Sequence, residues 1–335
     1  MGDHDVQVED APPPTPGPGE VLVEPRFVGI CGSDVHIYEG LHPGVARPIV
    51  LGHECTGIVV GSSNGSLAPG TPVGVVPLFG CGECAHCRLG QSYICIRREV
   101  MGFQRPGCLS ELLALPAANV LPIRDGQDLA LLSLFEPLAV AMHGANLAEP
   151  ARGEHAIIVG AGNIGLLLAT YLRFEVGVTV SLIDIHAARV RLARELGFEA
   201  VGQLSELDLG HELARPLAFD CVGLAASADT ILDIVPAPRV AVLIGTYQPN
   251  ASVGLARLKR WETRVVGSQI YTLAELQRAI DILGSPTRDA YRRLQVQDQY
   301  ELAQIRDALE AARASSAGTK VVVRIDSQSP AVGKR

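Results

Sequence analysis

Residues 155–171 read HAIIVGAGNIGLLLATY, a short apolar run followed by a glycine-rich turn and a second apolar run. This pattern reads as a buried strand, a turn and a helix. The turn carries the sequence G-x-G-x-x-G in the strand-to-helix setting that dinucleotide binding requires. The stretch therefore predicts a Rossmann unit, and its phosphate-binding turn consists of Gly160, Ala161, Gly162, Asn163, Ile164 and Gly165.

Each glycine of this turn has a separate predicted role: Gly160 permits the tight turn, Gly162 lets the backbone approach a pyrophosphate, and Gly165 lets helix and strand pack closely. Nineteen residues past Gly165, Asp184 ends the next strand-like run, VTVSLID. A carboxylate there accepts the ribose hydroxyls and repels a 2′-phosphate, so we expect NAD rather than NADP. Arg189 is a candidate for a 2′-phosphate, although its place in AARVRLARELG favours a solvated helix face.

Two kinds of sequence pattern divide the chain. From Glu154 onward strand-like runs alternate with helical stretches, which predicts βαβ units and a parallel sheet. The earlier residues are rich in Gly and Pro, with short β-type runs typical of a partly closed barrel. Two helix-like segments, TLAELQRAIDILG and YELAQIRDALEAARA, precede a last strand, GTKVVVRID, that could return to the first half. We expect an NAD-binding Rossmann domain at 147–284 and a β-rich catalytic domain made of 1–146 and 285–335.

Composition excludes several function classes. The net charge is −8 with no basic stripe, which argues against a nucleic-acid partner. Eight cysteines in a long chain without a signal peptide do not indicate a disulfide framework, and a reducing cytoplasm suits thiolate ligands. The apolar stretch 156–172 is interrupted by glycines, and the apolar stretch 129–148 contains a carboxylate followed by proline. We expect neither to span a membrane.

The stretch CGECAHCRLGQSYIC spaces four cysteines by two, two and seven residues. Four soft thiolates on one tight loop, with glycines at Gly82 and Gly90, suit tetrahedral Zn²⁺ because the loop must fold around a single point. The sequence therefore predicts a structural zinc held by Cys81, Cys84, Cys87 and Cys95.

A second, differently built metal site is indicated upstream by GICGSDVH and LGHE. Cys31, His53 and Glu54 are plausible ligands of a first-row metal, far enough apart to come from different strands and leave one position open. Each is ambiguous alone, because a lone cysteine is more often a small buried hydrophobe and a lone histidine more often a hydrogen-bonded core residue.

These motifs together resemble one family. GICGSDVH, LGHE, the four-cysteine loop and VGAGNIG occur in the same order as in the zinc-dependent medium-chain alcohol and polyol dehydrogenases. The resemblance covers nearly the whole chain. Residues 136–143, EPLAVAMH, are similar to the acid-Pro-Leu segment of the sorbitol, butanediol and threonine dehydrogenase branch. The resemblance implies that Glu136 binds the catalytic zinc directly or through water.

The resemblance also implies an activity and an architecture. A GroES-like catalytic domain and a Rossmann domain would hold two zinc ions and NAD in each chain of a cytoplasmic homodimer or homotetramer. The reaction would be the reversible oxidation of a secondary alcohol, either a polyol, a vicinal diol, an amino alcohol or a cyclitol, to the ketone. Threonine 3-dehydrogenase-type activity is the alternative within the family.

Individual roles follow from the matched motifs. Cys31 and His53 would be firm ligands of the catalytic zinc, and Glu54 would be a ligand in some states and lie beside the ion in others. Ser33 matches the hydroxyl that takes the substrate proton, and His36 matches a relay histidine nearer solvent.

Some features separate this chain from the family or leave other classes open. It starts with Met1-Gly-Asp-His where the family opens with a strand, so either the sequence is truncated or that strand is absent, and the segment from Tyr38 to Pro48 is short. A catalytically inactive NAD-binding sensor and a zinc-free enoyl reductase are disfavoured because both ligand sets are present. We expect Cys55, Cys108 and Cys221 to serve packing alone.

Overall fold

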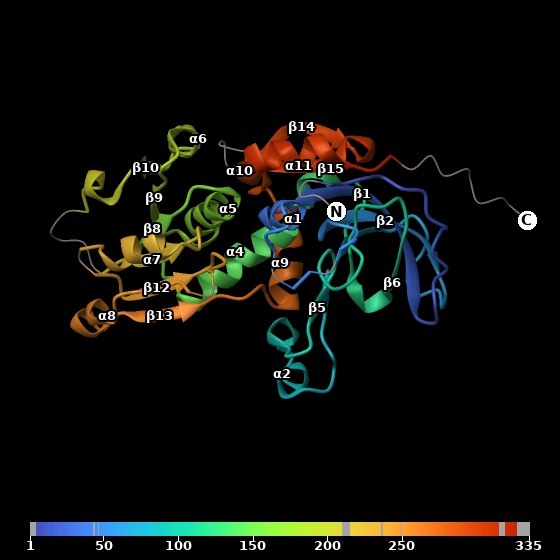
Figure 1. The fold of residues 1–335 in the computed structure, drawn as a ribbon, viewed down its shortest axis with the longest axis horizontal. Helices are drawn as coiled ribbons and strands as arrows, with labels where there is room; N and C mark the ends of the chain where they lie inside the picture. Colours follow the sequence, from blue (N-terminus) through green and yellow to red (C-terminus); the bar gives the residue numbers. More distant parts are fainter. Residues whose placement is uncertain are drawn as a thin grey trace, which may run out of the picture.

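The computed structural model describes residues 5–42, 44–45, 47–209, 215–235, 237–248, 250–314 and 319–326. Figure 1 shows two halves side by side, one built on a parallel sheet and the other on a larger, mostly antiparallel sheet. This arrangement confirms the predicted α/β class with a doubly wound sheet and a second, β-rich part.

The parallel sheet has six strands in the order β10-β9-β8-β11-β12-β13. From β8 the chain adds β9 and β10 on one side of the sheet, and then β11, β12 and β13 on the other side of β8. The ends of β8 and β11 therefore mark the point where a doubly wound sheet binds its ligand. The strands are β8 (His155–Val159), β9 (Thr179–Ile183), β10 (Glu199–Val201), β11 (Leu217–Asp220), β12 (Val240–Leu243) and β13 (Arg264–Gly267).

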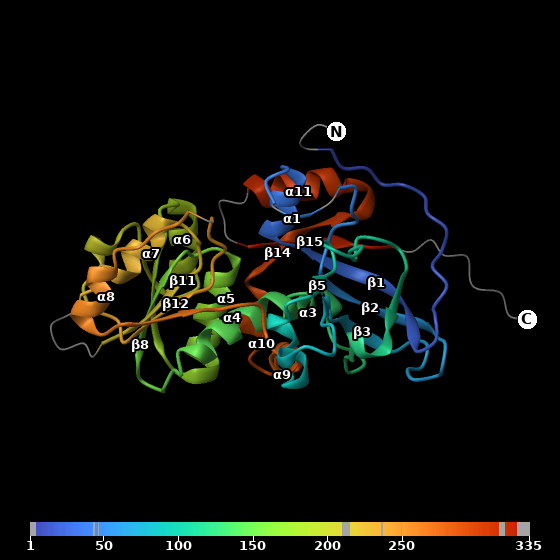
Figure 2. The ribbon, with the colours of Figure 1, turned by 60° about the horizontal axis from the view of Figure 1, so that its bottom comes forward.

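Helices cover both faces of this sheet (Figure 2). In β8, Ala156 and Ile158 belong to the core that includes helices α4 (Phe135–Leu147) and α5 (Asn163–Tyr171). The alternate residues, Ile157 and Val159, belong to a separate core on the face of α7 (Ala225–Leu232). Both sets are buried because a strand covered on two faces is apolar at every position.

The other half is built around a seven-stranded sheet in the order β14-β15-β1-β2-β3-β7, with β6 also paired to β1. The last strand, β15, pairs antiparallel with β1, which confirms that the chain's end returns to the first half. Residues 5–19 precede β1 without forming a strand. The strands are β1 (Glu20–Ile30), β2 (Glu54–Ser62), β3 (Pro72–Val75), β6 (Leu113–Pro116), β7 (Val120–Pro122), β14 (Gln295–Glu301) and β15 (Lys320–Arg324).

A small lobe carries the four cysteines and projects from the β-rich half (Figure 1). It contains the two-stranded sheet of β4 (Leu78–Phe79) and β5 (Glu99–Val100) and the one-turn helix α2 (Ala85–Arg88). The remaining helices are α1 (Gly32–Tyr38), α3 (Leu129–Leu132), α6 (Ala187–Glu195), α8 (Leu255–Trp261), α9 (Leu273–Leu283), α10 (Arg288–Arg292) and α11 (Ile305–Ala314).

One expected helix is shorter than predicted. The segment YELAQIRDALEAARA was expected to be helical throughout, but α11 begins only at Ile305, and Tyr300 and Glu301 end strand β14. Tyr300 is paired in parallel with Val323 of β15. The strand partner lies far away in sequence, so tertiary pairing outweighs the local helical pattern here.

The domain boundaries stay a prediction. One continuous apolar core joins Val76 of the β-rich half to α4, α5 and α9 and continues to Leu294, so packing crosses residues 146 and 285. Within the part of the chain that the structure describes, no helix is both long and apolar enough to traverse a bilayer.

Candidate metal centres and dinucleotide site

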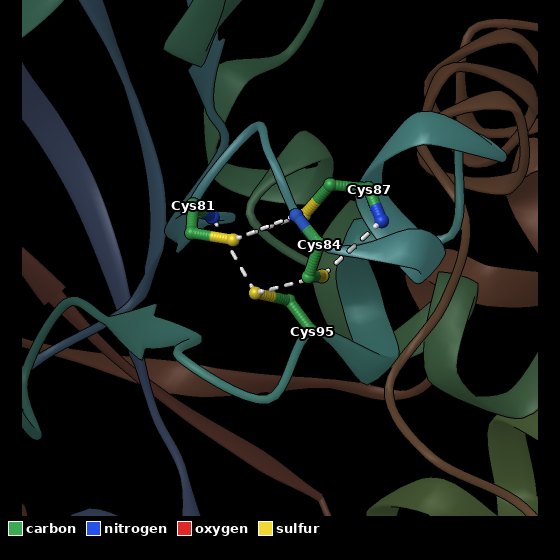
Figure 3. Close-up of side chains that lie close together, drawn as sticks. All are labelled: Cys81, Cys84, Cys87 and Cys95. Atoms are coloured by element: carbon green, nitrogen blue, oxygen red, sulfur yellow. Dashed lines mark hydrogen bonds between the residues drawn. The ribbon is translucent and has the colours of Figure 1, made fainter.

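The four cysteines of the projecting lobe converge on one point (Figure 3). The Cys81 and Cys87 sulfurs lie 3.9 Å apart, and those of Cys84 and Cys95 lie 3.8 Å apart. Sulfurs around tetrahedral Zn²⁺, with Zn–S bonds of about 2.3 Å, are separated by about 3.8 Å. The donor set therefore fits zinc, and Gly82 and Gly90 take the positive φ of 75° that the tight loop needs.

Backbone amides point at these sulfurs and favour the thiolate form. The amide of Cys84 donates to Cys81 Sγ at 3.4 Å, and the amide of Cys87 donates to Cys84 Sγ at 3.5 Å. Hydrogen bonds from the amides of Glu83 and Cys84 lower the pKa of Cys81 to about 6. Burial, in contrast, raises the pKa of the Cys87 thiol.

The second donor group is assembled from separate strands. Cys31 directly follows β1, Glu54 is the first residue of β2, and the two strands pair with Gly29 opposite Glu54. One donor atom each from Cys31, His53 and Glu54 lies within 4.8 Å of the others. His53 and Glu54 are buried, whereas Cys31 is partly exposed, so the group has a closed side and an open side. Mixed S, N and O donors in this arrangement fit a catalytic zinc.

Asp34 fastens the two ligand segments together. It is fully buried, and its carboxylate accepts hydrogen bonds from the backbone amides of Cys31 at 2.8 Å and Gly52 at 3.1 Å. Asp34 Oδ1 also lies 3.7 Å from His53 Nδ1, which is too long for a direct hydrogen bond but close enough for charge attraction. Sequence reasoning missed this role, although an acid three residues after the helix N-cap is a known capping signal.

The groups around His53 favour a positive charge at this position. Burial alone would lower the pKa of its imidazole, yet Asp34, Cys31 and Glu136 raise it well above its usual value. Burial also raises the pKa of Glu136 to about 7, and the charge of Glu54 adds to the rise. The structure therefore places Glu136, in the first turn of α4, near this donor group without including it among the three converging ligands.

Ser33 and His36 lie on helix α1, which starts directly after Cys31. Ser33 Oγ is buried and has no hydrogen-bond partner, so a hydroxyl is available beside the donor group. His36 is exposed, one helical turn farther along. The roles of both residues in a proton path stay predictions.

The glycine turn after β8 has the geometry expected from sequence. Gly160 has φ of 101°, which a residue with a side chain rarely adopts. A Cβ at Gly165 would overlap the carbonyl oxygen of Gly160, whereas one at Gly162 would meet only the Arg189 guanidinium, at 3.9 Å. Asn163 and Ile164 begin α5, whose N-terminus faces this turn.

Asp184 and Arg189 both lie beside that turn. The Asp184 carboxylate accepts hydrogen bonds from the amides of Ala161 and His186, each at 2.8 Å. An Arg189 guanidinium nitrogen lies 3.5 Å from Asp184, and this side chain is 28% exposed. Arg189 thus keeps partial exposure on its helix while its guanidinium lies toward the glycine turn, and its role in cofactor binding stays a prediction.

The other cysteines differ from both donor groups. Cys55 and Cys108 are fully buried in the core of the β-rich half, in keeping with a packing role. Cys221 follows β11 and packs against the core of the parallel sheet.

Comparisons with known proteins agree with this geometry. Residues 17–125 match the alcohol dehydrogenase GroES-like domain. L-Galactonate-5-dehydrogenase of Escherichia coli K12 is 31% identical over 266 residues, which is 76% of this chain and 77% of that protein.

Solved structures extend the likeness to the whole fold. A zinc-binding dehydrogenase from Sinorhizobium meliloti 1021 bound to NADP is 28% identical, with a TM-score of 0.84 over 96% of this chain and 97% of that one. An alcohol dehydrogenase from Escherichia coli CFT073 complexed with NADH is 25% identical, with a TM-score of 0.86 over 96% of this chain and 97% of that one.

The matched domain, the related sequence and the two structures cover both halves of the chain and name a single chemistry. The chain is therefore an oxidoreductase that acts on CH–OH groups, and it belongs to the zinc-dependent medium-chain family of alcohol and polyol dehydrogenases.

Proposed function

We propose that this protein catalyses the reversible, NAD-dependent oxidation of a secondary alcohol to a ketone at the Cys31–His53–Glu54 group. The observation that carries the proposal is the convergence of these three donors from the end of β1 and the start of β2, with an unpartnered hydroxyl at Ser33, two residues after Cys31. A purely structural site has no need of a buried, unsatisfied hydroxyl.

Cys31, His53 and Glu54 would hold the catalytic zinc, and Glu136 would act through water because it lies outside the converging set. When bound, zinc supplies Lewis acidity that lowers the pKa of a substrate hydroxyl. Asp34 holds the Cys31 and Gly52 amides and keeps the two ligand segments in register. The protein thus orients the substrate and supplies the electrostatic environment, while the nicotinamide contributes the redox chemistry.

The proton leaves along α1. Ser33 Oγ accepts the hydroxyl proton from the substrate and passes it toward His36, whose exposed imidazole releases it to water. The two residues are three apart on a helix, which places their side chains on the same side.

The turn after β8 would hold the dinucleotide, with Gly162 at its pyrophosphate and Asp184 at its adenosine ribose. The open backbone at Gly162 supports the first contact, and the buried carboxylate of Asp184 supports the second. NAD is favoured because a 2′-phosphate would meet this negative charge. Arg189, paired to Asp184, would be a positive partner for a phosphate in that position.

A reducing compartment such as the cytoplasm suits eight cysteines that form no disulfide. Strand β13 is an edge of the parallel sheet, and Val265 on it and Trp261 before it stay 38% and 44% exposed. This unpaired edge supports a homodimer, or a tetramer of such dimers, which light scattering on a sizing column would detect.

The test is a substrate panel with NAD, with reduced cofactor followed by absorbance. The panel contains polyols, vicinal diols, cyclitols, sugar acids and amino alcohols, with threonine as the specific test of the alternative activity and ethanol as the primary-alcohol control. We expect turnover of a secondary alcohol by protein that holds two zinc ions per chain. Active protein without tightly bound zinc would contradict the proposal.

A further inference from the structure

Lys320 is buried beside the Cys31–His53–Glu54 group, although it lies 266 residues from Glu54 in the sequence. Its side chain is 4% exposed, and that of Glu54 is 1% exposed. Its ammonium donates to Glu54 Oε1 at 2.6 Å and to the carbonyl oxygen of Ile30 at 3.1 Å. It is the one lysine or arginine among the buried polar residues of the described chain. Burying an ammonium is costly, so its position needs an explanation.

Three neighbouring strands bring this pair together. Strand β1 lies between β15 and β2, and Gly29 of β1 pairs with Val322 on one side and with Glu54 on the other. Lys320 precedes Val322 by two residues, so both point to the same face of the sheet as Gly29 and Glu54. The ammonium therefore reaches across β1 to the carboxylate.

Gly29 makes this crossing possible. A Cβ at that position would overlap Glu54 Oε2, which occupies the space left by the absent side chain. The chain continues directly from Gly29 through Ile30 to Cys31. The glycine thus admits the Glu54 carboxylate into the donor group from the neighbouring strand.

The two oxygens of Glu54 have different surroundings. Oε1 is held by Lys320, whereas Oε2 is buried and has no hydrogen-bond partner. A buried, unsatisfied carboxylate oxygen is costly in isolation and is expected where a ligand completes it. A carboxylate oxygen of Glu54 lies within 4.8 Å of the donor atoms of Cys31 and His53.

We propose that Lys320 is a positioning residue for the catalytic metal: by holding Glu54 Oε1 across Gly29, it presents Oε2 as the single Glu54 oxygen for the ion or for a water beside it. This proposal rests on the proposed function, since it requires a metal at Cys31 and His53. It adds to that function a residue from β15, so the metal centre also depends on the pairing of β15 with β1. Metal sites depend on such outer partners to orient their ligands.

A purely structural role is the competing explanation. Lys320 would then only fasten β15 to β1, and its loss would weaken the fold without acting through Glu54. The two explanations differ in how a Lys320 variant responds when Glu54 is already altered, because coupled residues give non-additive effects.

The experiment measures zinc occupancy against a series of chelator-buffered free zinc concentrations, with elemental analysis of zinc per chain. The variants are Lys320→Met, Glu54→Gln and the double variant, with Lys259→Met as matched control because Lys259 is exposed on α8. In Lys320→Met we expect the free zinc that half-fills the second site to rise about ten- to a hundred-fold. In the Lys259 variant, and on adding Lys320→Met to Glu54→Gln, we expect a change of less than about two-fold.

Two results would overturn the proposal: a Lys320→Met protein that fills both sites as the wild type does, or an equal loss of affinity in the wild-type and Glu54→Gln backgrounds. If Lys320→Met does not fold, Lys320→Gln serves instead, since an amide can still donate to Oε1, and we expect a smaller loss in the same direction. Failure of the proposed function is distinguishable, because the wild-type protein would then hold a single zinc.

Discussion

The two candidate metal centres are built in opposite ways. The four-cysteine centre comes from one segment of 15 residues, 81–95, and three of its four ligands, Cys81, Cys84 and Cys87, are only partly buried. The Cys31–His53–Glu54 centre joins two strands. Asp34 hydrogen-bonds the Gly52 amide beside it, and Lys320 of β15 hydrogen-bonds Glu54. The first centre can form wherever its loop is present, while the second forms only when the β-rich half has folded.

This difference predicts a division of labour. A centre made by one loop stabilises that loop, because binding the ion closes the local chain. A centre assembled from distant strands is positioned by the whole sheet, which gives the precision that catalysis needs. Variants of the two centres should therefore fail in different ways.

His53→Ala should give the largest effect and separates the centres most sharply. We expect kcat/KM to fall by at least about a thousand-fold, because Lewis-acid stabilisation is worth several kcal/mol. Binding of the reduced dinucleotide, measured by fluorescence titration, should change little, since the glycine turn lies in the other half. Near-normal turnover by zinc-free His53→Ala protein would show that this centre is not catalytic.

Cys84→Ser should instead damage stability. We expect zinc per chain to fall from two to one and the melting temperature to drop by several degrees, since a loss of 1 kcal/mol lowers it by about 2–4 °C in chains of this order of size. Cys221→Ser is the matched control, because Cys221 belongs to neither donor group. If Cys84→Ser keeps both zinc ions and its melting temperature is unchanged, the four-cysteine loop does not hold a structural zinc.

Helix α4 links the two centres and offers a third comparison. It carries Glu136 in its first turn and His143 two turns later. The His143 ring meets the ring of Tyr93, from the four-cysteine loop, at 5.1 Å, and its Nδ1 lies 2.9 Å from Glu275 Oε2 at the start of α9. The four-cysteine loop therefore rests on the helix that presents Glu136.

The Glu275 contact should make this link sensitive to acid. Burial raises the pKa of Glu275, but hydrogen bonds from His143 and the Thr272 amide outweigh this effect. The net result lowers its pKa from 4.5 to about 2. A depressed carboxyl pKa gives stability that is present above pH 4.5 and is lost as pH falls toward 2. Glu275→Gln should cost about 1–2 kcal/mol at neutral pH.

Thermal unfolding of Glu275→Gln and wild type between neutral pH and pH 3 checks this expectation. The gap between their melting temperatures should narrow below pH 4.5, where the wild type starts to lose the benefit of the carboxylate. Asp281→Asn, an exposed change on the same helix, should show no such pH dependence. A constant gap across the range would show that the charge of Glu275 does not support α4.

The contrast between the centres also explains how far sequence reasoning could go. Local signals predicted the cysteine loop and the glycine turn, because in each the neighbours in space are neighbours in sequence. Asp34 and Lys320 were missed, since their partners lie on other strands and depend on sheet register. A lysine in the apolar run KVVV was the available signal for the second, because a charge on a buried strand needs a partner.

Asp184→Asn gives the smallest expected effect and tests a site of intermediate kind, in which a local turn meets one residue from the next strand. The amide oxygen can still accept a hydrogen bond from the Ala161 amide, so the turn should persist while the negative charge is lost.

We expect the ratio of kcat/KM for NAD over NADP to fall about ten-fold, equivalent to about 1.4 kcal/mol. Arg189→Ala is the matched comparison, because it removes the positive partner and should move the ratio in the opposite direction. If neither variant moves the ratio, the Asp184–Arg189 pair only stabilises the turn, and selection between the cofactors must come from another contact. Opposite shifts of this ratio in the two variants would show that the net charge of the Asp184–Arg189 pair determines the choice between NAD and NADP.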